Sequence, residues 1–355
     1  MSSHRPLSPH NGELPDPVIT GGIAARCGHV EQKRLFMTPE TDRHNFSLAR
    51  SQRSLILSHI AAAACVTMWG LSFVSSSVLL DVHHMGTVEL YIYRFTMAYL
   101  LVLAISHKRF RSHSLRDELL FCACGVTAGS IYFIAENTAL KVVSSTDVSL
   151  LTSLSPLLTV LLAGFLYNRG RFDWRILLGS AIAFIGVACV IFNSATSLEV
   201  NPLGDFLSIG AALSWAIYSL VLRRLSANYD VWYATRKTFF YGVITAIPFL
   251  FIMPGNLHNP TDFFCSYDAL LNLLFLSLGA SMAAYLLWAI AIKSLGAVTA
   301  GNYMYFQTPV TMIAAFFILD EKITAIGIIG CVLIIGGLWL GDWLSRRHAL
   351  RAQGR

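Results

Sequence analysis

The chain has 355 residues, of which 55% are hydrophobic and only 13% charged, with a formal net charge of +6. Soluble domains carry about 25% charged residues, so this chain has too little charge to cover a water-exposed surface. Its mean hydropathy is +0.59, and its apolar residues come in blocks of about the 20 residues that cross a hydrocarbon core. Because lipid cannot satisfy backbone polar groups, such blocks must be helices. Composition thus indicates an all-α membrane protein and excludes a soluble enzyme.

Residues 1–54 differ from the rest of the chain. They are rich in Pro, Ser, His and Gly, and they contain no apolar run long enough for a signal-peptide core. We expect a disordered cytoplasmic tail here. A second interpretation takes Met37 as the true start of the chain. A shorter basic tail is expected at 345–355.

Ten apolar spans follow the first tail. Their approximate limits in chain order are 55–80, 87–106, 117–140, 143–167, 174–193, 203–222, 231–253, 268–292, 297–319 and 324–344. The fourth and ninth are the least apolar, and each holds a central proline, Pro156 and Pro309. The spans divide into a first half over 55–193 and a second half over 203–344.

Positive charges give the orientation of the spans. If odd-numbered spans run outward, the inner loops contain Lys108, Arg109, Arg111, Arg116, Arg169, Arg171, Arg175, Arg223, Arg224 and Lys293. The outer loops contain only Lys141 and Lys322. Cytoplasmic loops carry an excess of Lys and Arg, so both termini are predicted to be cytoplasmic, which requires an even number of spans. Because the positive residues are spread over the loops and the two ends, no nucleic-acid surface is expected.

Landmark residues recur in the same order in both halves. The corresponding positions are Trp69 and Trp215, Lys141 and Lys293, Pro156 and Pro309, and the glycines Gly179 and Gly186 with Gly330 and Gly337. Five spans per half is an odd number, so the second half must be inverted in the membrane. Inverted repeats are typical of secondary transporters, whose substrate site lies near the midplane where the repeats meet. The alternative is that apolar helices resemble one another by composition alone.

These landmarks resemble the EamA family of the drug/metabolite transporter superfamily over residues 55–345. The matching residues are Trp69-Gly70, Tyr93-Arg94-Phe95, Ala139-Leu140-Lys141, Pro156, Ser214-Trp215-Ala216, and Pro309 leading to Asp320-Glu321-Lys322. The resemblance implies ten helices in two antiparallel five-helix halves, and export or uptake of small metabolites such as amino acids. The family usually has a Glu shortly after the fourth and ninth helices. This chain has Glu321 in the second half but Asn168 in the first.

Two charged residues within the spans are candidates for function, because charge inside a membrane is costly. Arg94 in span two and Glu136 in span three are expected at similar depth. Glu136 shares a helical face with Tyr132, Gly129 and Gly125, and this small, polar face resembles a cavity lining. The pair is interpreted either as a substrate or proton site, or as a buried ion pair that locks spans two and three together.

Polar stripes accompany the two mid-span prolines. Tyr303, Gln307 and Thr311 lie on one face beside Pro309, and a run of hydroxyl residues precedes Pro156. A proline frees backbone carbonyls that only a cavity or a neighbouring helix can satisfy. The stripes therefore indicate a cavity or, alternatively, hydrogen bonding between helices.

Several aromatic residues lie deep in the spans rather than at the interfaces. Trp69, Trp215, Tyr218 and Trp288 are candidates for stacking on a substrate, with packing as the alternative. Arg236 and Lys237, near the inner start of span seven, are expected to snorkel to the cytoplasmic interface. Asp147 and Asp205 are expected as helix-terminus residues.

No phosphate-binding glycine loop, nucleophile elbow or metal-spaced histidine pair is present in the sequence, so no cofactor or metal is expected. The leading hypothesis is a secondary transporter in the cell (inner) membrane that exports small metabolites such as amino acids by alternating access. Its expected partners are the small-molecule substrate and the lipid bilayer, and both a monomer and a homodimer remain open. The alternatives are a membrane-embedded transferase and a non-transport membrane assembly protein.

Overall fold

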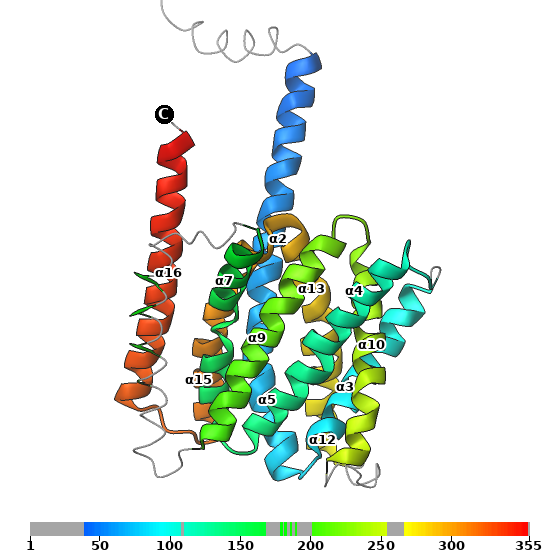
Figure 1. Cartoon of the computed structure of the whole chain (residues 1–355), viewed down its shortest axis with the longest axis vertical. Coiled ribbons are helices and arrows are strands. Elements are labelled where there is room, and N and C mark those ends of the chain that lie inside the picture. The colour runs from blue at the N-terminus through cyan, green and yellow to red at the C-terminus, as the bar shows by residue number, and fades with distance from the viewer. Residues whose placement is uncertain are drawn as a thin grey trace, which may run out of the picture. The chain divides into compact units, whose positions relative to one another are not determined.

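The computed structural model of the protein describes residues 39–107, 110–167, 201–253 and 266–353, together with the helical residues 178–179, 181–182, 185–186 and 189. All regular elements in these ranges are helical (Figure 1). The chain divides into two compact units, residues 1–53 and residues 54–355. In the first, the helix α2 begins at Pro39, within the stretch predicted as a tail. Residues 1–38, including Met37, and Asn168 lie outside the described residues.

The helices follow one another through short connections. In chain order they are α2 (Pro39–Ser77) with the π-helical η1 (Val78–Val82), α3 (Thr87–Ile105), α4 (Leu115–Gly125) with η2 (Val126–Ile131) and α5 (Tyr132–Leu140), α6 (Ser145–Thr152), α7 (Ser155–Tyr167), α9 (Pro202–Leu225), α10 (Val231–Ile252), α12 (Tyr267–Leu274) with η3 (Phe275–Ala283) and α13 (Ala284–Leu295), α14 (Ala297–Gly301) with η4 (Asn302–Phe306) and α15 (Gln307–Ile318), and α16 (Ala325–Gln353).

Six helical stretches among the described residues are long and apolar enough to cross a membrane. They are Leu55–Val82, Thr87–Ile105, Leu115–Leu140, Ser145–Leu166, Pro202–Leu225 and Tyr267–Leu295. They match the predicted spans one to four, six and eight. Predicted spans seven, nine and ten are also helical, as α10, α14 to α15 and α16. Most of predicted span five lies outside the described residues.

Polar caps explain where several helices start. Ser114 accepts a hydrogen bond from the Asp117 amide before α4, and Ser144 accepts one from the Asp147 amide before α6. Such caps satisfy amides that have no partner within the helix. Asp147 and Asp205 lie in the first turns of α6 and α9, as predicted for helix-terminus residues.

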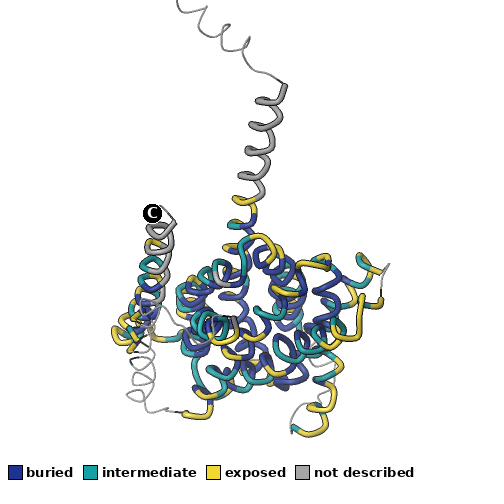
Figure 2. Tube along the Cα trace, turned by 45° about the horizontal axis from the view of Figure 1, so that its top comes forward, coloured by how far each residue is buried: buried dark blue, intermediate teal, exposed yellow. Residues whose placement is uncertain are grey.

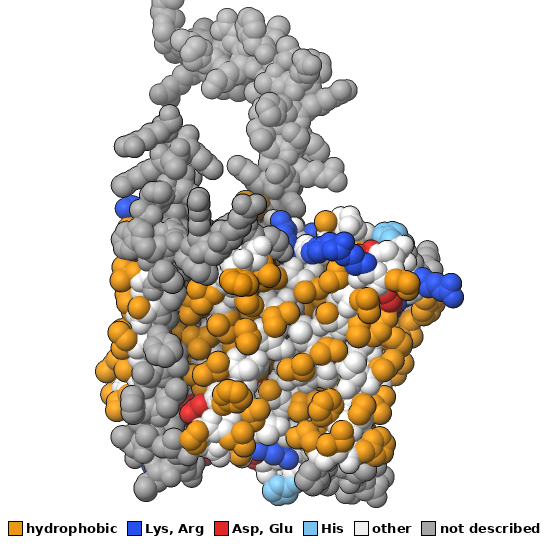
Figure 3. All heavy atoms as spheres, in the orientation of Figure 1, with side chains coloured by type: hydrophobic (Ala, Val, Ile, Leu, Met, Phe, Trp, Pro, Cys, Tyr) orange, Lys and Arg blue, Asp and Glu red, His pale blue; other side chains and the backbone are white. Residues whose placement is uncertain are grey.

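The surface of the 54–355 unit is that of a membrane protein. Large apolar side chains are widely exposed, among them Phe165 (70%), Phe206 (73%) and Phe317 (76%). Figure 3 shows hydrophobic side chains spread across the middle of one face, with Lys and Arg gathered at its upper edge. Soluble monomers rarely expose so much contiguous apolar area, so these side chains face lipid. Figure 2 shows that buried residues are concentrated in the central helices of this unit.

We divide the helices into two bundles, which also pack on each other through α10 and α3, α6 and α15, and α7 and α14. The first bundle consists of α2, α3, α12 to α13 and α14 to α15. Within it the Trp69 indole donates to the Ala280 carbonyl (3.0 Å), the Thr311 hydroxyl donates to the Gly70 carbonyl (2.9 Å), and α3 packs on η3. The second bundle consists of α4 to α5, α6 to α7, α9 and α10, where α5 packs on α9 and α10 packs on α4 and η2. Each bundle therefore combines helices from both predicted halves.

Residues predicted to correspond in the two halves lie close together in the folded chain. The rings of Trp69 and Trp215 lie 5.0 Å apart, edge to face. A Cβ on Gly179 would lie 2.5 Å from the Gly337 carbonyl, and one on Gly186 would lie 2.8 Å from the Gly330 carbonyl. A two-fold axis between the halves would exchange Gly179 with Gly330 and Gly186 with Gly337. The Gly179–Gly337 contact would then map onto the Gly330–Gly186 contact, so the two contacts are equivalent under this symmetry.

The π-helical segments change which residues share a face. The prediction of one continuous face for Gly125, Gly129, Tyr132 and Glu136 is wrong. A Cβ on Gly125 would lie 2.6 Å from the Gly242 amide nitrogen, so the glycine half of that face packs tightly on α10. Gly129 lies within the π-helical η2, and the wider turn of η2 takes Tyr132 and Glu136 out of the α-helical register with Gly125.

Candidate functional site

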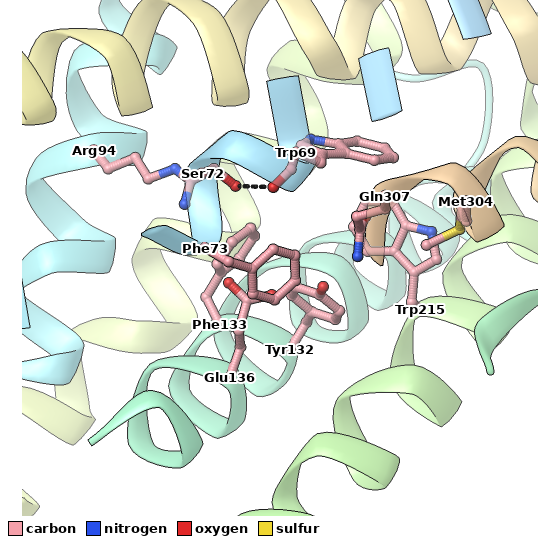
Figure 4. A pocket seen from close by; sticks show the side chains of 10 residues that line it. All are labelled: Trp69, Ser72, Phe73, Arg94, Tyr132, Phe133, Glu136, Trp215, Met304 and Gln307. Carbon is pink, nitrogen blue, oxygen red and sulfur yellow. Dashed lines mark hydrogen bonds between the residues drawn. The ribbon is translucent and has the colours of Figure 1, made fainter. Parts of the chain in front are cut away.

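A pocket between the bundles collects most of the predicted site residues. The first bundle contributes Trp69, Ser72, Phe73, Arg94, Met304 and Gln307, and the second contributes Tyr132, Phe133, Glu136 and Trp215 (Figure 4). The cavity volume is about 10 Å³, which holds about one water molecule. This conformation is therefore too closed to hold a metabolite.

Arg94 is the cationic group of the pocket. It is 1% exposed, and its Nε donates to the Ser281 hydroxyl at 2.5 Å. Its guanidinium lies 4.7 Å from the Phe133 ring centre, a cation–π contact between the bundles. Its Nη2 is buried without a hydrogen-bond partner. Because buried polar groups are nearly always paired, this free donor leaves a place for an acceptor from a ligand.

Glu136 is the anionic group of the pocket. It is 2% exposed on α5, and it interacts with the hydroxyl of Tyr132, one turn earlier on the same helix. No salt bridge joins Glu136 to Arg94, although both line the pocket. In this conformation Arg94 and Glu136 therefore do not form the direct salt bridge of the ion-pair interpretation. The two residues belong to different bundles, and Arg94 is held by Ser281 instead.

The polar stripes serve mainly to join helices. The Thr311 hydroxyl donates to Ser149 Oγ at 2.9 Å, and the Gln307 amide donates to Thr152 Oγ1 at 3.4 Å. These bonds connect α15 of the first bundle to α6 of the second. Of the predicted stripe, only Gln307 lines the pocket. Tyr303 lies elsewhere, with its hydroxyl 2.7 Å from His59 Nδ1.

The two prolines lie at breaks in their helices. Pro156 follows the interruption between α6 and α7. It packs beside Gly301, since a Cβ added to Gly301 would lie 3.3 Å from the Cβ of Pro156. Pro309 follows the 3₁₀ segment η4, which replaces α-helical geometry over Asn302–Phe306. Neither proline lines the pocket, so both shape the helices that carry it.

The deep aromatic residues have different surroundings. Trp69 has its indole nitrogen occupied by the Ala280 carbonyl, whereas the indole nitrogen of Trp215 is buried without a partner. Both rings line the pocket. Tyr218 and Trp288 pack against these rings at 5.0 and 5.1 Å but do not line the pocket. The packing interpretation therefore holds for Tyr218 and Trp288 in this conformation.

Sequence reasoning missed several neighbours of the site and misplaced two cations. Ser72, Phe73, Phe133 and Met304 line the pocket but carry no charge that would mark them in a sequence. Snorkelling of Arg236 and Lys237 is wrong, since they are 2% and 9% exposed. Lys237 forms an ion pair with Glu118, and Arg236 donates to the Ser106 carbonyl. Among the described residues, no cluster of three His, Cys, Asp or Glu side chains could hold a metal ion.

Comparison with known proteins places the chain in a family. The EamA-like transporter family matches residues 56–192 and 202–340, one copy in each predicted half. An uncharacterized transporter of Archaeoglobus fulgidus is 28% identical, over 79% of this chain and 96% of that protein.

Two further relatives are named for what they export. A probable terminal-alkyne amino-acid exporter of Streptantibioticus cattleyicolor is 25% identical, over 83% of this chain and 97% of that protein. A probable amino-acid metabolite efflux pump of Escherichia coli is 24% identical, over 79% and 93%. One crystal structure shares the fold with a TM-score of 0.56 at 18% identity, over 83% of this chain and 99% of that chain. The chain belongs to the EamA-like transporter family and is a multi-pass membrane transporter, not an enzyme.

Proposed function

We propose that the protein is a secondary transporter that exports a small zwitterionic metabolite of the amino-acid class by alternating access. The observation that carries this proposal is the pocket between the bundles, which contains one buried cation and one buried anion that are not paired with each other. Unpaired charges inside a membrane are costly, so a ligand that neutralises both stabilises the closed pocket.

The free donor of Arg94 defines the acidic end of the substrate. Arg94 Nη2 is buried and lacks an acceptor, as does Trp215 Nε1 on the other side of the pocket (Figure 4). A carboxylate supplies charge-assisted acceptors for such groups. Glu136 would bind the ammonium end, and the rings of Phe73 and Phe133 would contact an apolar side chain. The names of the two exporter relatives agree with this class of substrate.

The proposed topology is ten membrane-spanning helices in two inverted five-helix repeats, with both termini in the cytoplasm. The proposed location of the protein is the inner (plasma) membrane of the cell. The reciprocal glycine contacts and the two family matches support the repeat. Arg223, Arg224 and Lys293 lie in the last turns of α9 and α13 at one end of the helices, whereas Lys141 and Lys322 lie in the connections at the other end. We call these the inner and outer faces. One chain supplies the whole pocket, so a monomer is sufficient for transport.

Alternating access follows from the arrangement of the bundles. The pocket lies between them and holds about one water molecule, so it has no room for a metabolite in this conformation. Separation of the bundles at one end would open the pocket to that face only. Such motions of pseudo-symmetric halves around a fixed central site are the usual mechanism of transporters with inverted repeats.

Flux measurements in proteoliposomes test the proposal. Radiolabelled neutral amino acids should exchange across the membrane, with and without a pH gradient. The matched amino alcohols, which lack the carboxylate, and the deaminated acids, which lack the ammonium, should compete at least about tenfold more weakly, as expected when a charged hydrogen bond is lost. Equal competition by the three classes would contradict the zwitterion assignment. Flux of none of them through folded protein would contradict the proposed function.

A further inference from the structure

Charged side chains cross from one bundle to the other at both faces, and two of them, Glu321 and Arg223, bind the ends of helices. Arg236 of α10 also crosses at the inner face, where it donates to the Ser106 carbonyl at the end of α3. Glu321, in the connection between α15 and α16, reaches α6 at the outer face. Arg223, near the end of α9, reaches the end of α13 at the inner face. Figure 1 shows these ends on opposite sides of the helices, with α5 and α12 marking the outer face and α4 and α13 marking the inner face.

The outer contact is a carboxylate held at a helix start. Glu321 accepts hydrogen bonds from the amide and the hydroxyl of Ser145 (2.9 and 2.5 Å) and from those of Thr146 (3.3 and 2.6 Å). The partial positive charge at the start of α6 adds to these bonds. Glu321 therefore fastens the connection that follows α15, in the first bundle, to the first turn of α6 in the second.

The inner contact has the opposite sign. Arg223 Nη1 donates to the carbonyls of Ile292 (2.8 Å) and Lys293 (3.0 Å), in the last turn of α13. A guanidinium at a helix C-terminus satisfies carbonyls that have no partner within the helix and interacts favourably with the helix dipole. This contact fastens α9 of the second bundle to α13 of the first.

Two salt bridges, Lys237 with Glu118 and His83 with Asp268, differ from these contacts, because each lies within one bundle. Lys237 and Glu118 join α10 to α4 in the second bundle. His83 and Asp268 join the end of η1 to the start of α12 in the first bundle, at 3.0 Å. Neither would have to break if the bundles moved as units. The Glu321 and Arg223 contacts would have to break.

A second cavity adjoins the Glu321 contact. Its volume is about 490 Å³, and its lining includes Thr146, Asp147, Thr308, Glu321 and Lys322. Gln307 lines the central pocket, and its neighbour Thr308 lines this larger cavity. The wall between the two spaces is therefore the seam between α6 and α15, which Glu321 closes at its outer end.

We propose that Glu321 and Arg223 act as latches of the transporter, one on each face, and that each opens in turn during a cycle. This inference rests on the proposed alternating-access function. With both latches closed, the bundles are held together and the central pocket has a volume of only about 10 Å³. When the outer latch opens, the pocket connects to the larger cavity. The residue that matches Glu321 in the first half is Asn168, so the inner face uses a different latch.

Labelling of one reporter cysteine from each side of the membrane tests the latches without any substrate. Ser72→Cys lies in the central pocket, and its labelling by a membrane-impermeant thiol reagent reports access from the side of addition, after subtraction of the rate for the parent protein. Glu321→Gln should raise labelling from outside at least about tenfold, and Arg223→Gln should do so from inside, each by loss of hydrogen bonds to a charged group.

Neighbouring residues provide matched controls. Asp320→Asn and Arg224→Gln remove the same charges from exposed side chains beside each latch, and neither should change labelling. Ser145→Ala removes one donor to Glu321 and should act in the same direction as Glu321→Gln. Labelling rates of the latch variants equal to those of their controls would overturn the proposal, and so would a rise on the same side for both. Because the readout is independent of substrate, failure of the amino-acid assignment would not imitate either result.

Discussion

Replacement of Arg94 by methionine should abolish tight substrate binding without unfolding the protein. Methionine removes the charge and keeps much of the length of the side chain. The substitution gives up the hydrogen bond to Ser281 (2.5 Å), and hydrogen bonds to charged groups contribute about 1.5–3 kcal/mol. It also removes a buried cation that has no ion-pair partner, whose desolvation costs several kcal/mol. The two terms oppose each other, so stability should stay within about 1 kcal/mol of wild type or rise.

Affinity should respond differently from stability. Loss of one charge-assisted bond to the substrate carboxylate, about 1.5–3 kcal/mol, weakens binding about 10- to 150-fold. Half-saturation in counterflow measures the affinity, and the monodisperse fraction after heating in detergent measures the stability. Arg94→Lys, which keeps the charge but not the planar guanidinium, should lie between the two proteins in affinity.

The double variant with Glu136→Gln distinguishes this reasoning from a buried ion pair. If Arg94 and Glu136 were partners, removal of one would cost about 3–5 kcal/mol, and the double variant would recover much of that loss. Since no salt bridge joins them, the interaction energy in a double-mutant cycle should be below about 1 kcal/mol. An interaction energy of 3 kcal/mol or more would refute the assignment of the two residues to separate substrate groups.

Three further experiments test the roles of the pocket tryptophans, of the contact between α4 and α10, and of the Lys237–Glu118 ion pair. Trp215→Phe should weaken binding of a carboxylate substrate about tenfold while keeping stability. Trp69→Phe should instead lower thermal stability, because only the indole nitrogen of Trp69, of these two, is hydrogen-bonded within the protein. Equal effects of the two substitutions on affinity in the flux assay would contradict this. Gly125→Ala should destabilise the protein by about 1–3 kcal/mol, since its Cβ would lie 2.6 Å from a backbone nitrogen of α10. Gly210→Ala should not, because no atom lies within 4 Å of its Cβ. Equal melting temperatures of the two variants would show that α10 moves to make room for the added methyl group. Lys237→Met should lower stability by about 1–3 kcal/mol, because it leaves Glu118 without its ion-pair partner. Affinity should stay unchanged, because Glu118 lies outside the pocket. A change in half-saturation at constant stability would place this ion pair in the transport path instead.

Composition and spacing were sufficient to predict the membrane character of the chain and most of its helices. Apolar blocks of about 20 residues can only be helices in lipid, so this result does not depend on tertiary contacts. The predicted correspondence of Trp69 with Trp215, and of the two glycine pairs, also pointed to residues that lie close together in the folded chain. The inclusion of Arg94, Glu136 and Gln307 in one pocket agrees with the argument from the cost of buried polar groups.

Tertiary structure alone decided what each polar group contacts. The π-helical η2 turned Gly125 and Gly129 away from the pocket, and a sequence does not show where a helix widens. Lys237 is buried because α4 brings Glu118 to it, a contact between residues 119 positions apart in the chain. Partners so distant are set by the packing of whole helices into bundles, so local periodicity cannot assign them. For the same reason, the contact of Glu321 with α6 is visible only in the folded protein.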